Sequence, residues 1–224
     1  MCGRVIQTST PEAIRRLFDA IAPAPNAPPR YNGAPSQELM VLRRNPETGE
    51  RTLQLLRWGL IPSWTKDAKG GRKPINARAE TIATSPMFKA AYAKRRCLLP
   101  IDGFFEWKAI KGSKTKQPYA LAMKDRSPFA VAGIWENWTR PDTGEAIRSF
   151  AVITCEANQL VNQIHDRMPV IIAPTDYDRW LGPEIDPRDL MKPFPAELMT
   201  MWPVSTRVNS PRNDDAALLD PVVT

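Results

Sequence analysis

The first third of the chain combines one helical pattern with two strand-like runs. Apolar side chains recur at helical spacing over residues 14–21, directly after Thr10 and a proline. This spacing predicts a short amphipathic helix with Thr10 as its N-cap, ended by the Pro/Ala-rich stretch 23–29. The strand-like runs 39–44 and 51–58 flank an Asn-Pro-Glu-Thr-Gly segment, whose residues favour a turn, so together they predict a β-hairpin.

Short strand-like runs separated by turn residues dominate the rest of the chain. They cover residues 97–101, 103–109, 119–123, 129–135, 149–154, 168–172 and 201–204. We expect helices from Ser85, as N-cap, to Arg96, over 157–164 and over 176–181. The sum predicts an α+β fold, in which helices surround a curved, mainly antiparallel and barrel-like β-sheet, as a single domain over residues 1–224.

The composition is that of a globular protein with a basic surface. Hydrophobic residues make up 42% of the 224 positions, enough for a core without metal or disulfide staples. The net charge of +7 favours a polyanionic partner through steering and counterion release, although surplus lysines also serve solubility alone. Apolar runs are too short for a membrane-spanning helix and no secretory signal is evident, so we expect a cytoplasmic monomer without membrane contact, nucleoid-associated if bacterial.

Three cysteines, Cys2, Cys97 and Cys155, follow no framework spacing. An odd number without regular spacing argues against a disulfide scaffold and for a reducing compartment. No C-x-x-C pair accompanies them or the only histidine, His165. We therefore expect neither a zinc site nor any cofactor.

Cys2 is the residue whose position offers the most chemistry. A small second residue permits removal of Met1, which would leave a free α-amine beside a thiol. Because the ordinary pKa values of both groups lie close to neutrality, neutral amine and thiolate would coexist there. The amine can attack an aldehyde to give an imine, and the adjacent sulfur can then close a thiazolidine ring. The alternative interpretation is a tolerated residue on a frayed terminus.

Two side chains are candidates for proton transfer. His165 lies where a helix-like segment meets a strand, and imidazole is the usual proton carrier near neutral pH, but a lone histidine can also be structural. Glu106 lies between Phe105 and Trp107 in a strand-like run, so it can face a cavity while its neighbours face the other side. Such a carboxyl could protonate a sugar ring oxygen and take the proton back; alternatively, it is an outward-facing carboxylate paired with lysine.

Polar and aromatic residues nearby could bind a nucleic acid. Asn76 and Arg78 are two residues apart, so an extended backbone would project an amide, able to orient a carbonyl, and a phosphate-gripping guanidinium from one face. A phosphate held by Arg4 would bring the adjoining deoxyribose within reach of Cys2. Trp64, in a long Pro/Gly/Lys-rich loop, could stack on bases or wedge between them, or it could plug the core.

Several segments together resemble the SRAP family, the SOS-response-associated peptidase-like proteins that crosslink to abasic sites. In chain order they are MCGR from Met1, RYNGAPSQ from Arg30, RWGLIPSW from Arg57, INARAET from Ile75, RRCLLPIDGFFEW from Arg95, AGIWENW from Ala132, IHDRMPVII from Ile164 and PVSTRVN from Pro203. Their shared order across nearly the whole chain is far more specific than any single motif.

The resemblance implies an abasic-site sensor of single-stranded DNA, including single-strand/double-strand junctions, that protects the lesion during the DNA damage response. It implies that Cys2 forms a thiazolidine crosslink and that Asn76 positions the terminus. Glu106 and His165 would transfer protons during crosslinking and reversal. DNA contacts are implied at Arg4, Pro35, Trp64, Arg78, Thr154 and Arg167. The family also implies autocatalytic removal of Met1 and some β-elimination, an AP lyase activity, through the imine.

The chain departs from the family pattern at one position. Some relatives carry a second tryptophan beside Trp64, where this chain has Ser63, so the resemblance supports a wedge at Trp64 less strongly than it supports the chemistry at Cys2.

Two other function classes are open. A thiol peptidase acting in trans would use Cys97 or Cys155 as nucleophile and His165 as base, oriented by Asp166 or Glu106. Neither internal cysteine lies in a recognisable nucleophile motif. A non-covalent single-strand binder would use the same basic groove without any crosslink.

Overall fold

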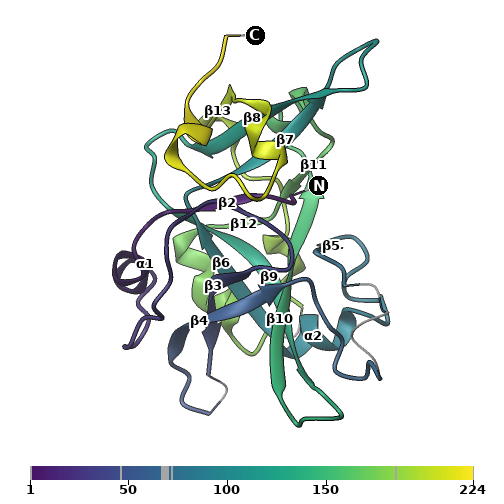
Figure 1. The fold of residues 1–224 in the computed structure, drawn as a ribbon. Helices are drawn as coiled ribbons and strands as arrows, with labels where there is room; N and C mark the ends of the chain where they lie inside the picture. Colours follow the sequence, from purple (N-terminus) through teal and green to yellow (C-terminus); the bar gives the residue numbers. More distant parts are fainter. Residues whose placement is uncertain (1, 46, 67–70, 72, 185, 224) are drawn as a thin grey trace.

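Five strands close into a ring that forms the centre of the fold (Figure 1). The computed structural model describes residues 2–45, 47–66, 71, 73–184 and 186–223. The ring consists of β3 (Glu38–Arg44), β4 (Arg51–Trp58), β6 (Arg96–Ile101), β9 (Phe129–Thr139) and β10 (Ala146–Glu156). β10 closes it, because it pairs antiparallel with β9 on one edge and parallel with β4 on the other. The predicted α+β fold with a curved, mainly antiparallel and barrel-like sheet is confirmed, and so is the hairpin of β3 and β4.

A second, five-stranded sheet lies against the ring, at the top of Figure 1. Its order is β13 (Met199–Pro203), β8 (Lys116–Met123), β7 (Gly103–Ala109), β1 (Val5–Gln7) and β2 (Arg30–Gly33). The buried amide of Gln7 ties it to the ring: Nε2 donates to the carbonyls of Met40 (3.0 Å) and Pro100 (2.7 Å), and Oε1 accepts from the Met40 N–H. A buried amide with all these bonds fixes the position of β1.

Three short strands pair with β9 or β10, and they contain parts of the INARAET and IHDRMPVII segments. β5 (Asn76–Arg78) runs parallel to β10, while β11 (Arg167–Pro169) is antiparallel to β10 and β12 (Ile171–Ile172) is antiparallel to β9. The single strand predicted over 168–172 is therefore divided. Val170 bridges the gap, since its N–H bonds to Ile153 and its carbonyl accepts from Ala132.

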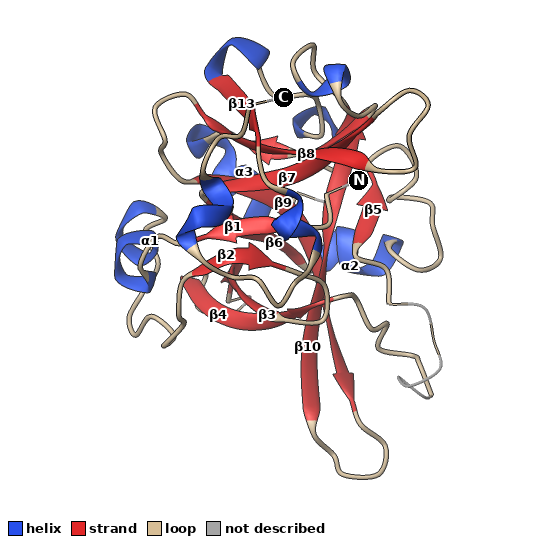
Figure 2. Cartoon of the chain, turned by 45° about the horizontal axis from the view of Figure 1, so that its top comes forward, coloured by secondary structure: helices blue, strands red, loops and turns tan. Residues whose placement is uncertain are grey.

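Helices lie at the periphery of the strands (Figure 2). They are α1 (Pro11–Leu17), α2 (Lys89–Lys94) and α3 (Tyr177–Leu181), with short 3-10 turns at Val161–Gln163, Pro174–Asp176, Arg188–Leu190, Ala196–Leu198, Thr206–Asn209 and Ala216–Leu219. The predicted cap of α1 is confirmed, because Thr10 Oγ1 accepts from the Ala13 N–H. None of the helices in the described part of the chain has the length and apolar character needed to cross a bilayer.

Two predicted helices differ from the structure. The helix expected from Ser85 begins only at Lys89, because residues 79–88 form successive turns and the Ser85 side chain caps nothing. The helix expected over 157–164 is reduced to one 3-10 turn. The Asn158 side chain bonds to the start of this turn, since its Oδ1 accepts from the Val161 N–H, and its Nδ2 donates to the Phe194 carbonyl. The turn then closes as a 3-10 turn, because the Ile164 N–H bonds to the Val161 carbonyl three residues before it.

The core fills the ring and the space between ring and helices. Trp58 stacks on Phe150 with ring centres 6.1 Å apart, and Trp180 of α3 donates from Nε1 to the Cys97 carbonyl at 2.9 Å. A smaller cluster lies under the second sheet and contains Ile6, Phe105, Ala120, Val204, Val208 and Leu218. This second cluster packs the C-terminal segment against β1 and β7.

Candidate active site

Cys2 lies fully buried beside β5. Nδ2 of Asn76 donates a hydrogen bond to the Cys2 carbonyl at 2.9 Å. The other amide atom, Oδ1, is buried and has no hydrogen-bond partner among the described residues. Because β5 is held in parallel register on β10, with Asn76 opposite Val152, the amide is presented from a rigid strand. Figures 1 and 2 both show the N-terminal end of the chain next to β5 and the last part of β10.

Glu106 approaches Cys2 from the second sheet. β1 and β7 pair with Val5 opposite Phe104, and the Phe105 N–H bonds to the Arg4 carbonyl at 3.0 Å. This pairing brings Cys2, which precedes Arg4 by two residues, close to Glu106, which follows Phe105. Glu106 is only 2% exposed. It is therefore not the outward-facing strand carboxylate of the alternative interpretation.

The environment of the Cys2 sulfur disfavours a thiolate. Burial raises the pKa of the Cys2 thiol far above its ordinary value, and the negative charge of Glu106 raises it further. An apolar enclosure and a nearby carboxylate both disfavour an anion. The coexistence of neutral amine and thiolate, which was predicted for the terminus after removal of Met1, stays a prediction. Met1, whose removal the resemblance implies, lies outside the described residues.

His165 lies between the 3-10 turn at Val161–Gln163 and β11. Its Nδ1 is 2.9 Å from the Arg167 backbone N–H and also 2.9 Å from the Asp166 carboxylate. One nitrogen cannot both accept from an N–H and donate to a carboxylate in the neutral ring. We assign the backbone bond to the neutral form, because the Asp166 side chain is 84% exposed and well solvated. The neutral imidazole then has its proton on Nε2.

Arg167 and Thr154 form a second part of the site. The Arg167 guanidinium makes two parallel bonds to Glu80, at 2.5 and 2.9 Å, and donates to the Thr154 carbonyl at 2.7 Å. Hydrogen bonding to Arg167 lowers the pKa of Glu80. Thr154 is buried and lies opposite exposed Arg78 in the register of β5 and β10. Arg78, Thr154, Arg167 and His165 therefore gather at the same end of β10.

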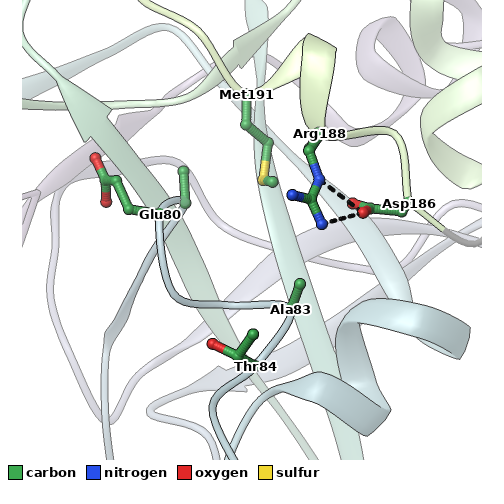
Figure 3. Close-up of a pocket in the computed structure, with 7 residues that line it drawn as sticks. Glu80, Ala83, Thr84, Asp186, Arg188 and Met191 are labelled. Atoms are coloured by element: carbon green, nitrogen blue, oxygen red, sulfur yellow. Dashed lines mark hydrogen bonds and ion pairs between the residues drawn. The ribbon is translucent and has the colours of Figure 1, made fainter.

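A small cavity lies beside the Arg167–Glu80 ion pair, because Glu80 is one of its lining residues (Figure 3). It has a volume of about 260 Å³ and is lined by Ala79, Glu80, Ala83, Thr84, Asp186, Arg188 and Met191. Arg188 pairs with Asp186 along one wall, whereas the Glu80 carboxylate points away from that pair (Figure 3). Cys2, Asn76, Glu106 and His165 are not among its described lining residues. The cavity therefore flanks the predicted reaction centre.

Arg4 lies two residues from Cys2, but the protein already uses much of its guanidinium. Nη1 donates to Asn32 Oδ1 (3.1 Å) and to the Val208 carbonyl (2.6 Å), and Nη2 donates to the Asn209 carbonyl (3.1 Å). A phosphate contact from Arg4 would have to use its remaining N–H groups. In this structure Arg4 fastens the C-terminal segment beside the N-terminus.

Asn32 is a functional-site neighbour that sequence reasoning missed. Fully buried, it accepts from Arg4 and donates from Nδ2 to the carbonyls of Val208 (3.1 Å), Ser210 (3.1 Å) and Asn213 (2.8 Å). The neighbouring backbone is held by Asp214, whose Oδ1 accepts from the Asn32 N–H at 2.9 Å. The signal was present in the RYNGAPSQ segment, but its partners lie about 180 residues away, as the Asn213 bond shows (|i−j| = 181).

Replacing Asn32 with alanine is expected to lower the free energy of unfolding by about 3 kcal/mol, because a buried guanidinium contact and several carbonyls lose their partner together. Denaturant unfolding followed by tryptophan fluorescence would measure this change. Asn213→Ala is the matched control, since the half-buried Asn213 side chain makes one hydrogen bond within the described part of the chain, to the Arg207 carbonyl, and its expected cost is below about 1 kcal/mol. Equal costs for both variants would show that Asn32 is not the centre of this network.

Trp64 and Pro35 occupy accessible positions. Trp64 is 66% exposed, so it does not plug the core, and the alternative interpretation is wrong. Its loop is anchored next door, where Trp138 Nε1 donates to the Thr65 carbonyl at 2.6 Å. Pro35 is partly exposed in the turn between β2 and β3. Both side chains are therefore accessible to solvent, while residues 67–70 and 72 of the Trp64 loop lie outside the described part.

The internal cysteines do not form a second reaction centre. Cys97 is completely buried in the ring, and burial raises its pKa far above the ordinary range. Burial also raises the pKa of Cys155 to about 12. A nucleophilic thiol needs access and an easily formed thiolate, so these environments oppose a thiol peptidase built on either residue. No group of three or more His, Cys, Asp or Glu side chains within the described ranges is placed to hold a metal ion.

Comparisons with known proteins agree with this arrangement. The family model described as SOS response associated peptidase (SRAP) matches residues 1–211. Abasic site processing protein YoqW of Bacillus subtilis is 39% identical, covering 98% of this chain and 99% of that protein. Abasic site processing protein YedK of Escherichia coli is 33% identical, covering 99% and 100%. Abasic site processing protein HMCES of Xenopus tropicalis is 31% identical, covering 96% of this chain and 76% of that protein.

A solved structure gives the same result for the fold. The crystal structure of a protein from Bacteroides thetaiotaomicron superimposes with a TM-score of 0.88 at 25% identity, covering 99% of this chain and all of that one. A protein from Bordetella bronchiseptica has a TM-score of 0.78 at 28% identity, covering 91% and 100%. The overall fold is therefore shared with experimentally determined structures.

Proposed function

Because the chain belongs to the SOS response associated peptidase (SRAP) family, we propose that it captures abasic sites in single-stranded DNA through a covalent bond to Cys2. The observation that carries this proposal is the convergence of Asn76 and Glu106 on Cys2 from two different sheets. The names of the relatives support processing of abasic sites. We further propose that residues 1–224 act as one SRAP-like domain, a cytoplasmic monomer that protects the lesion during the damage response.

The first step exposes the reactive amine. Hydrolysis of the Met1–Cys2 peptide bond consumes one water and leaves a primary amine on Cys2. Asn76 holds the Cys2 carbonyl, so the new terminus keeps its orientation after the bond is cut. The free Oδ1 of Asn76 can then accept a hydrogen bond from that amine.

The second step joins protein and sugar. The amine adds to the open-chain aldehyde of the abasic deoxyribose and loses water to form an imine. The Cys2 sulfur then bonds to the imine carbon while its proton passes to the nitrogen, which closes a five-membered ring. The amine attacks first, because the sulfur closes the ring on the imine carbon that this attack creates. Holding both nucleophiles on one residue makes the ring closure intramolecular.

Glu106 and His165 supply the proton transfers. Glu106 lies beside the thiol, where it can protonate the ring oxygen that opens to the aldehyde and recover the proton on reversal. His165 presents Nε2–H in its neutral form and can assist the loss of water from the addition product. β-Elimination from the imine, an AP lyase reaction, competes whenever sulfur addition is slow.

The DNA contacts follow the end of β10. Arg78 and Arg167 would hold phosphates on either side of the lesion, with Thr154, Pro35 and the spare N–H groups of Arg4 along the same path. Trp64 would stack on a base at a single-strand/double-strand junction. A phosphate that binds Arg167 would compete with the Glu80 carboxylate, because Glu80 already accepts two hydrogen bonds from this guanidinium.

Denaturing electrophoresis tests the proposal. The chain is incubated with a single-stranded oligonucleotide that contains one abasic site, and the control is the same oligonucleotide with an intact base. We expect a slower band that survives denaturation only with the abasic strand, formed by protein whose mass lacks Met1. Binding without such a band would identify a non-covalent single-strand binder, and full crosslinking by protein that retains Met1 would disprove the thiazolidine mechanism.

A further inference from the structure

A large basic cavity lies apart from the Cys2 site. It has a volume of about 780 Å³ and lies between the turn joining β3 and β4, the C-terminal end of α2 and the loop after α3. Its lining includes Arg44, Lys94, Arg95, Arg96 and Trp135. No predicted crosslinking or DNA-contact residue is among the lining residues that the structure describes. Any ligand of this cavity would therefore be additional to the captured sugar.

The basic side chains of the cavity fall into two groups. Arg96 is buried and anchored, since its guanidinium donates to the carbonyls of Tyr92 (2.8 Å), Gly182 (2.7 Å) and other backbone groups, and Arg95 pairs with buried Glu136 at 2.7 Å. The side chains of Arg44 and Lys94, by contrast, make no hydrogen bond or ion pair with any described residue. The positive charge of Arg44 nevertheless helps Arg51 to lower the pKa of Asp178. The cavity is therefore lined by two anchored guanidinium groups and by two basic side chains, Arg44 and Lys94, whose donors are not used by the described part of the protein. Glu47 adds a carboxylate from the exposed turn between β3 and β4.

Two glycines leave room for the Arg44 guanidinium. Gly49 adopts a φ of +75°, which favours glycine, and a Cβ there would lie 3.2 Å from Arg44 Nη2. A Cβ at Gly182 would lie 3.7 Å from Arg44 Nη1. The guanidinium is therefore enclosed by backbone from both sides, while its donors remain unused by the described residues.

An aromatic wall and an unused donor complete the cavity. Arg43 packs over Trp135 with its Cζ 4.0 Å from the ring centre, which fixes the indole plane. Arg43 itself is only 8% exposed and is bonded to Gln54. Nε of Arg95 is buried and lacks a hydrogen-bond partner among the described residues. A buried N–H without an acceptor is costly, although this atom has no surface that a ligand in the cavity could reach without a shift of the side chain.

We propose that this cavity binds a phosphate ester of a nucleotide, with Arg44 and Lys94 holding the phosphate and the nucleoside lying against Trp135. Arginine and lysine beside an aromatic face are the combination that recognises a phosphate next to a base. The ligand has two sources with this chemistry: a segment of the DNA strand beyond the crosslinking site, or a free nucleotide. A cavity distinct from the Cys2 site would let the protein hold DNA or sense nucleotides without occupying its reaction centre.

The experiment compares Arg44→Ala/Lys94→Ala with a charge-matched control, Arg16→Ala/Lys124→Ala, whose residues are exposed and lie outside the cavity. Arg44→Lys/Lys94→Arg keeps the charge and reports on folding. Calorimetry with deoxyadenosine triphosphate measures free-nucleotide binding. Fluorescence anisotropy with intact single strands of about 6 and about 25 nucleotides measures strand binding, because only the longer one exceeds a short groove.

If the cavity takes free nucleotide, the alanine variant loses triphosphate binding at least about tenfold and keeps its DNA affinity. If it takes the strand, affinity for the longer oligonucleotide falls about tenfold and the salt slope decreases by about 1.4, while the shorter one is unaffected. Binding identical to the control for every probe overturns the proposal. The rate of crosslinking at saturating abasic DNA should stay unchanged, so this result is separable from a failure of the Cys2 mechanism.

Discussion

Replacing Cys2 with alanine is expected to abolish the crosslinked band on abasic single-stranded DNA, and replacing it with serine should leave a much weaker one. Alanine removes the sulfur that closes the ring but keeps an amine, so only a reversible imine can form. We expect at least about a hundredfold less denaturation-resistant product for either variant. Borohydride reduction should trap the imine and recover a band, which would show that the amine still reacts.

Cys155→Ser is the matched control for the Cys2 variants, because Cys155 is also buried but is not part of the Cys2–Asn76–Glu106 cluster. It should retain the crosslinked band. The alanine variant should also fold, since Cys2 makes its hydrogen bond to Asn76 through the backbone carbonyl. A full band from Cys2→Ala without any reductant would remove sulfur from the mechanism.

Glu106→Gln is expected to slow crosslinking by about a hundredfold while changing DNA affinity by less than about twofold, because the amide keeps the shape but cannot carry the proton. Single-turnover kinetics at saturating DNA measure the first quantity and anisotropy the second. Arg78→Ala should do the opposite, weakening binding and lowering its salt dependence while the rate at saturation is retained. Equal loss of binding in both variants would contradict this division of roles.

The thiol gives an independent readout for Glu106. Its carboxylate contributes to raising the pKa of Cys2, so Glu106→Gln should lower that pKa, although burial keeps it above the ordinary value. Thiol reactivity measured against pH would therefore shift to lower pH in the variant. An unchanged profile would show that the Glu106 carboxylate does not act on the thiol.

Local patterns predicted the elements whose stability depends on near neighbours. The hairpin of β3 and β4 and the Thr10 cap each depend on residues a few positions apart, and both are present. The helix expected over 157–164 is only one 3-10 turn, and Asn158, which bonds to the start of that turn, is tied to Phe194, a residue far along the chain. Apolar periodicity alone does not report such a long-range contact.

The site was predictable in its members but not in its protonation or its support. Cys2, Asn76 and Glu106 were expected together, and the structure brings them together. The burial that keeps the thiol protonated depends on packing between two sheets, which no spacing reveals. Asn32 and the Arg167–Glu80 pair are likewise products of tertiary contact, since their partners lie 181 and 87 positions away.

The enclosure of the Cys2 sulfur has a consequence for chemical selectivity. Peroxides and alkylating agents attack the thiolate form of cysteine, and oxidation beyond the sulfenic acid stage is largely irreversible. A sulfur whose ionisation is disfavoured, on a residue without exposed surface, is a poor target for these reagents. The same burial that makes the thiol a poor general nucleophile thus keeps it unoxidised for ring closure.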